Sequence, residues 1–82
     1  MFGVQMIELC HHPGLLQQAQ VLEHWAECRE RAVARLELKV KLLEDQHQTD
    51  EATRLRSAAR YLRNAALRER VHAAELRRVA QR

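Results

Sequence analysis

Cysteine and histidine side chains occur in two groups in this chain, and both residue types bind metal ions and take part in redox chemistry. The first group is the run Cys10, His11 and His12, and the second is His24 with Cys28, one helical turn apart. A zinc site at recognisable spacing needs a second Cys/His pair, and none accompanies them. We therefore interpret these residues as surface positions and expect no bound metal or cofactor. A weak metal or redox site remains a second alternative.

Catalytic chemistry finds no support in the residue pattern. Ser57 is the only serine, and it falls within a regular helical pattern with no base arranged around it. Both glycines lie at or before position 14, so there is no glycine-rich loop that would hold a phosphate. The sequence predicts a non-enzymatic protein without a small-molecule substrate.

Charged side chains form two columns of opposite sign, each with a spacing of seven residues. The acidic column is Glu23, Glu30, Glu37 and Glu44, and the basic column is Arg56, Arg63, Arg70 and Arg77. Paired in reverse order, the residue numbers of every pair add up to 100, as they would in a chain that folds back on itself. We predict that these pairs align a helical hairpin, and that they set its register more than they stabilise it.

Two long helices are required to position these columns. The chain has 82 residues, and no glycine or proline follows residue 14. We expect a first helix at about 15–45, a turn at about 46–49 with Thr49 as N-cap, and a second helix at about 50–81. Because the turn is short, the helices should pack as antiparallel neighbours.

The apolar residues of both helices follow the three-four alternation of a coiled coil. We expect alanines, valines and leucines to share the seam, as Leu15, Ala19, Leu22, Ala26, Val33, Leu36, Val40 and Leu43 on one helix, and Leu55, Ala59, Leu62, Ala66, Ala73, Leu76 and Ala80 on the other. Arg29 and Glu69 interrupt this seam. Two registers remain open: Arg29 lies directly opposite Glu69 in one and about one turn away in the other, so the two charges meet in both.

The second edge of the hairpin is apolar and lacks polar cover. Its predicted residues are Trp25, Ala32, Ala58, Ala65 and Val79. A short apolar N-terminal arm at 1–14, ending in a Pro-Gly break, adds Phe2, Met6, Ile7 and Leu9. Contiguous apolar surface marks an interface, and a lone hairpin of this size has little core. The sequence therefore predicts an all-α, antiparallel two-helix coiled-coil hairpin that assembles into a four-helix bundle.

These observations favour a protein–protein interaction module: a dimerisation element, adaptor or small co-chaperone or assembly factor, acting as a homodimer or on a partner helix. The alternative is a nucleic-acid-associated module, because nine of the fourteen Lys and Arg residues lie in 49–82. We expect the arginines outside the basic column to be unpaired, and they are Arg54, Arg60, Arg68, Arg78 and Arg82. Two cysteines are too few for a disulfide scaffold, and no apolar run is long enough to span a membrane, so we expect a cytoplasmic protein.

Overall fold

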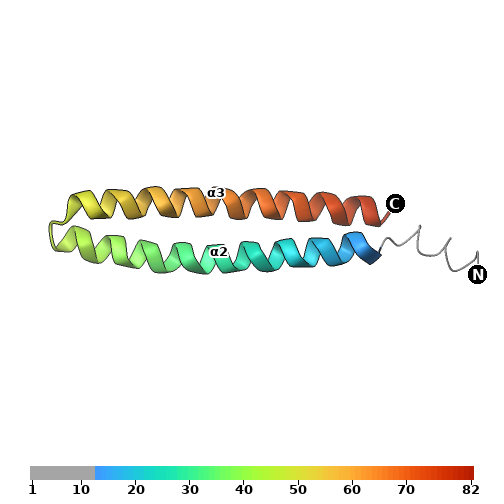
Figure 1. The fold of residues 1–82 in the computed structure, drawn as a ribbon, viewed down its shortest axis with the longest axis horizontal. Helices are drawn as coiled ribbons and strands as arrows, with labels where there is room; N and C mark the ends of the chain where they lie inside the picture. Colours follow the sequence, from blue (N-terminus) through green and yellow to red (C-terminus); the bar gives the residue numbers. More distant parts are fainter. Residues whose placement is uncertain (1–12) are drawn as a thin grey trace, which may run out of the picture.

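The computed structural model describes residues 13–82 as two long α-helices that lie side by side (Figure 1). Helix α2 spans Pro13–Asp45 with 33 residues, and helix α3 spans Thr49–Ala80 with 32. They run in opposite directions, so the start of α2 and the end of α3 lie at the same end of the molecule. The helical hairpin predicted from the sequence is thus confirmed. Residues 1–12, which contain most of the predicted arm, lie outside the described part of the chain.

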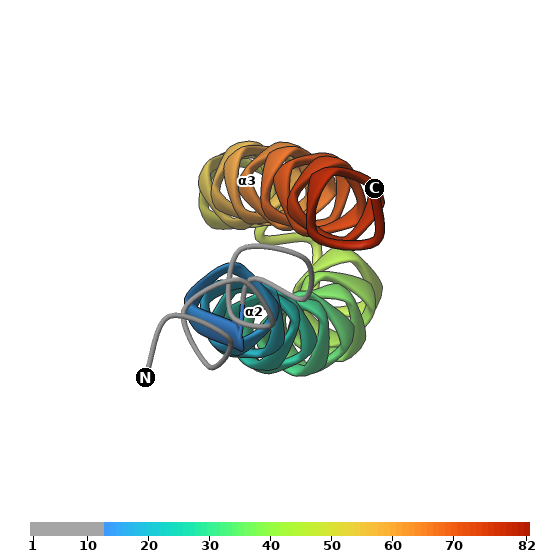
Figure 2. The ribbon, with the colours of Figure 1, turned by 90° about the vertical axis from the view of Figure 1, so that its right-hand side faces the viewer.

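The two helices turn about each other along their length, which is visible when the hairpin is viewed end-on (Figure 2). This winding follows from the seven-residue repeat, because a straight helix would rotate its apolar stripe away from its partner. Helix α2 begins at Pro13, two residues before the expected start. Proline suits a first helical position, where a backbone N–H would have no partner within the helix.

The hairpin reverses direction through a compact C-terminal cap on α2. The Gln48 amide donates to the Leu43 carbonyl at 2.8 Å, and the His47 amide donates to the Glu44 carbonyl at 3.0 Å. His47 adopts a left-handed backbone conformation with a φ of 63°. This combination is a Schellman motif, which gives hydrogen-bond partners to carbonyls that the helix leaves free at its end.

Helix α3 begins one residue earlier than expected. Thr49 was expected to cap α3, and this is wrong: Thr49 is its first helical residue, and the N-cap is Gln48, which makes no side-chain capping hydrogen bond. The amide of Gln48 completes the Schellman motif, so no residue separates that motif from the first residue of α3. Asp50 and Glu51 lie in the first turn, where negative charge interacts favourably with the helix dipole.

Alanine forms most of the contact between the helices. On α3 every buried residue is an alanine, at a spacing of seven: Ala52, Ala59, Ala66, Ala73 and Ala80. The buried residues of α2 are Ala19, Ala26, Val33, Val40 and Leu43. Small side chains at these positions permit a close approach of the two helix backbones. We call these two sets the alanine columns.

All leucines of the predicted seam except Leu43, which is buried, are only half-buried. They are Leu15, Leu22 and Leu36 on α2 and Leu55, Leu62 and Leu76 on α3. The sequence pattern placed alanines and leucines in one seam, whereas the structure centres the contact on the alanine columns and leaves the leucines at its margin. Side-chain size fits this arrangement on α3, where every buried position is an alanine, and near the turn the larger Val40 and Leu43 of α2 pack against Ala52.

Candidate functional site

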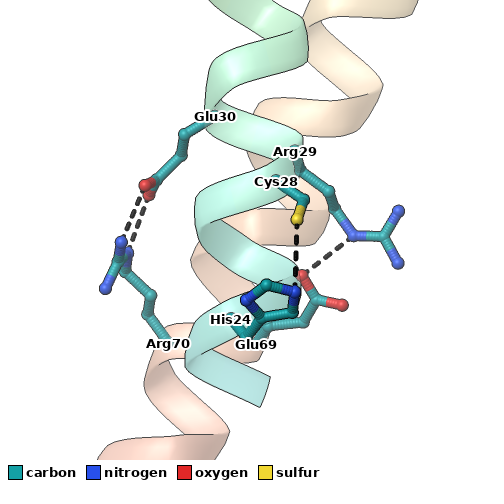
Figure 3. Close-up of polar contacts among 6 residues, drawn as sticks. All are labelled: His24, Cys28, Arg29, Glu30, Glu69 and Arg70. Carbon is teal, nitrogen blue, oxygen red and sulfur yellow. Dashed lines mark hydrogen bonds and ion pairs between the residues drawn. The ribbon is translucent and has the colours of Figure 1, made fainter. Parts of the chain in front are cut away.

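One edge of the hairpin is closed by the two charged columns. Arg70 donates from Nε and Nη2 to the two carboxylate oxygens of Glu30, both at 2.7 Å (Figure 3). Arg77 binds Glu23 in the same bidentate way, at 2.8 and 2.7 Å. The other two pairs of the columns, Glu37 with Arg63 and Glu44 with Arg56, are also in ion-pair contact. All four contacts predicted from the reverse pairing are therefore present.

These contacts keep the charged edge ionised and locally neutral. The hydrogen bonds from Arg77 and Arg70 lower the pKa of Glu23 and Glu30, respectively, because they favour the charged carboxylate. The same bonds raise the pKa of both arginines. Since each acidic side chain is matched by a basic one, this edge offers little net charge to a ligand.

The pair that interrupts the seam lies on the opposite side of the hairpin. Arg29 donates from Nε to Oε1 of Glu69 at 2.9 Å, and Figure 3 shows this bond on the far side of the helix pair from Glu30 and Arg70. This contact was expected in both registers. Only 13% of the Glu69 side chain is exposed, and its hydrogen bond raises the pKa of Arg29.

Around this pair lies a surface that we call the apolar edge. It consists of the six half-buried leucines together with Trp25, Ala32, Ala58, Ala65 and Val79. Trp25 is 51% exposed, Ala58 is exposed, and Ala32, Ala65 and Val79 are half-buried. The predicted arm residues Phe2, Met6, Ile7 and Leu9 lie outside the described residues.

Two hollows shape the apolar edge towards the open end of the hairpin. The larger encloses about 540 Å³ and is lined by Gly14, Val21, Leu22, Trp25, His72 and Leu76 among others. The smaller encloses about 300 Å³, and Leu22 and His72 line it together with Tyr61, Ala65 and Arg68. Val21 and Leu22 were not among the residues expected on this edge. The position of Val21 could have indicated it, because Val21 lies four residues before Trp25 on the same helical face.

His24 and Cys28 point towards one another on the outer surface of α2. The Cys28 sulfur lies 3.7 Å from His24 Nε2 (Figure 3). Arg31 donates a hydrogen bond to the same sulfur at 3.3 Å. Both residues are exposed. Among residues 13–82 no group of three or more His, Cys, Asp or Glu side chains is placed to hold a metal ion. Cys10, His11 and His12 fall outside this range.

The arginines outside the basic column do not form one surface. Arg78 was expected to be unpaired, which is wrong, because it forms an ion pair with Glu75 three residues earlier. Arg60 lines a hollow beside Arg56 and Arg63 on the charged edge, whereas Arg68 lines a hollow of the apolar edge. Arg54 and Arg82 are also exposed.

Neither α2 nor α3 has a stretch apolar enough, over sufficient length, to cross a membrane. Besides the charged edge and the apolar edge, the described residues expose the large apolar side chains of Leu38, Leu42, Leu67 and Val71. A scan against protein-family models finds no match, and searches of curated proteins and of solved structures find no significant match either.

Proposed function

We propose that this chain is a non-enzymatic protein–protein interaction module whose working surface is the apolar edge. The observation that supports this is the position of the leucines. Six leucines lie half-buried along this edge, and Leu22 and Leu76 line the same hollow as Trp25, whereas the contact within the hairpin is made mainly by alanine. Burying a leucine fully from an exposed state contributes about 1.5–3 kcal/mol, and a partner surface would add the part of this energy that the half-buried leucines have not yet gained.

The dimensions of the apolar edge suit a pair of additional helices. The leucine column of α2 runs from Leu15 to Leu36, which is about 30 Å at ~1.5 Å per residue. Two helices side by side are about 20 Å wide, which gives roughly 600 Å² on each partner. Stable interfaces bury about 800 Å² per partner, so contacts at the margin would complete one of standard size. A second hairpin packed on this edge would form a four-helix bundle.

Photocrosslinking tests this proposal in the cells that produce the protein. p-Benzoylphenylalanine in place of Trp25 or Ala65 lies on the apolar edge, whereas the same residue in place of Ala34 or Ser57 lies on exposed outer positions of α2 and α3. We expect discrete protein adducts from the first two positions and none from the control positions. Equal labelling at all four, or none at any, would contradict the proposal.

A cytoplasmic location belongs to the same proposal. Cys28 is an exposed free thiol, and two cysteines in the whole chain are too few for a disulfide scaffold. A membrane-impermeant maleimide should therefore label Cys28 only after the cells are lysed. Labelling of intact cells would place the protein elsewhere.

A further inference from the structure

We infer that the apolar edge binds an amphipathic helix of another protein, one whose apolar stripe is flanked by Asp and Glu. This inference rests on the proposed function and specifies the chemistry of the partner. It is carried by the distribution of charge around the apolar edge. We call the set Arg35, Lys39, Arg54 and Arg68 the basic border.

Arg68 shows directly that positive charge adjoins the apolar edge. It lines the smaller hollow together with Leu22 and Ala65, and its own side chain is exposed. Arg54 lies two heptads before Arg68 on α3 and therefore shares its helical face, with the exposed ring of Tyr61 between them. On this side of the apolar edge, α3 presents two arginines.

Helix α2 supplies the other half of the basic border. Lys39 lies two heptads after Trp25 and shares its face of the helix. Arg35 lies one heptad after Cys28, which lines a further hollow with Trp25. Both basic side chains are exposed, and like those of α3 they form no ion pair with any of residues 13–82.

Acidic residues on this side are few, and Glu69, which lines the smaller hollow, is bound by Arg29. Glu75 lies one heptad after Arg68, but Arg78 already binds it. Glu51 is exposed near the turn. At the opposite edge the glutamate and arginine columns neutralise each other and leave Arg60 without an ion pair among residues 13–82, whereas the four side chains of the basic border surround the apolar edge. A partner with complementary charge carries carboxylates on both sides of its apolar stripe.

This charge distribution also discriminates between classes of partner. A second copy docked through the same edge would bring two basic borders together, which like-charge repulsion disfavours. Nucleic acid would find the basic side chains, but the strip between them consists mainly of leucine, alanine, Val79 and Trp25, with His72 and the paired Arg29 and Glu69. That strip matches apolar side chains at helical spacing, as in the recognition of an amphipathic helix by a groove.

Two designed peptides test the inference on the full chain. Both carry leucine at heptad positions a and d; one has glutamate at e and g, and the other has lysine there. Trp25 is the only tryptophan and is half-exposed, so its emission reports burial on binding. We expect the acidic peptide to bind about tenfold or more tightly than the basic one at low salt, with the difference shrinking as salt screens the charges.

Charge-reversal variants locate the effect. The double variant Arg54→Glu, Arg68→Glu should lose the preference for the acidic peptide and bind the basic one more tightly. Arg60→Glu is the matched control, because Arg60 is also exposed and without an ion pair in 13–82 but lines the hollow on the charged edge. The control should keep the original preference.

The possible outcomes separate this inference from the proposed function. Equal binding of both peptides would overturn the charge argument and leave the interaction module intact. Binding of neither peptide would overturn the inference, and together with absent photocrosslinks it would remove the proposed function as well. The inference also fails if sedimentation shows self-association through the apolar edge, or if anionic vesicles or duplex DNA shift Trp25 emission while the peptides do not.

Discussion

Replacing one buried alanine with leucine should destabilise the hairpin, although leucine is more hydrophobic. Ala73 is 1% exposed and belongs to the alanine column of α3. Leucine adds three carbon atoms at the point where the helices are closest. Overpacking of this kind costs about 1–3 kcal/mol. A domain of this size loses about 4–8 °C in melting temperature per kcal/mol.

The neighbouring residue provides a matched control. Ala74 is exposed, and leucine is nearly as good a helix former as alanine, so Ala74→Leu should change the stability by less than about 0.5 kcal/mol. Thermal and urea unfolding, followed by far-UV circular dichroism, compare Ala73→Leu with Ala74→Leu on the same helix.

The sign of the change in stability for Ala73→Leu shows whether the alanine columns lie at the closest approach of the helices. If the alanine columns did not lie at the closest approach of the helices, a leucine at position 73 would bury its extra carbons without strain. Three methylene-sized groups would then stabilise the fold by about 2 kcal/mol. An increase in stability for Ala73→Leu, or equal effects of the two variants, would therefore refute the assignment of the contact to alanine.

Three further predictions concern polar groups. The hydrogen bond from Arg70 lowers the pKa of Glu30, so this pair stabilises the hairpin fully above the unfolded carboxyl pKa of about 4.3, and the stabilisation is lost as the pH falls through the folded pKa. Urea titrations of Glu30→Gln at decreasing pH should therefore show a shallower loss of stability in acid. An unchanged dependence of stability on pH would contradict this prediction. Arg29→Leu and Glu69→Leu should each lower the urea midpoint more than the double variant does, because either single change leaves one charge in the seam unpaired. A double variant that is less stable than both single variants would argue against this. His47→Gly should stabilise the hairpin by about 1 kcal/mol in the same assay, because glycine adopts the left-handed backbone conformation at position 47 without strain. A loss of stability would count against the C-terminal cap described for α2.

Much of the fold could be predicted because its signals are local and periodic. The spacing of Glu23 to Glu44 and of Arg56 to Arg77 is visible in the chain without any knowledge of packing. Because a helix repeats nearly every seven residues, this spacing assigns each column to one face. Reverse pairing then indicates an antiparallel hairpin and its ion pairs, which the structure contains.

Other features depend on contacts that no spacing rule specifies. Arg78 has Glu75 as a neighbour on its own helix and an open surface on the other side, and only the folded side chains show that the two bind. Likewise, the Schellman motif at His47 decides which residue ends the turn, so the expected cap at Thr49 was wrong. In both cases the residue pattern allows more than one arrangement: Arg78 paired or unpaired, and α3 capped by Gln48 or by Thr49.

The sequence by itself determined the two helices, their antiparallel order and the pairing of their charges, because these follow from the periodicity of a single helix. The rotation of each helix about its own axis was decided only by the tertiary structure. That rotation depends on how closely two backbones approach, and it is set by the side chains of both helices together. It buries alanines such as Ala73 and leaves Leu22 and Trp25 at the surface, beside the basic border.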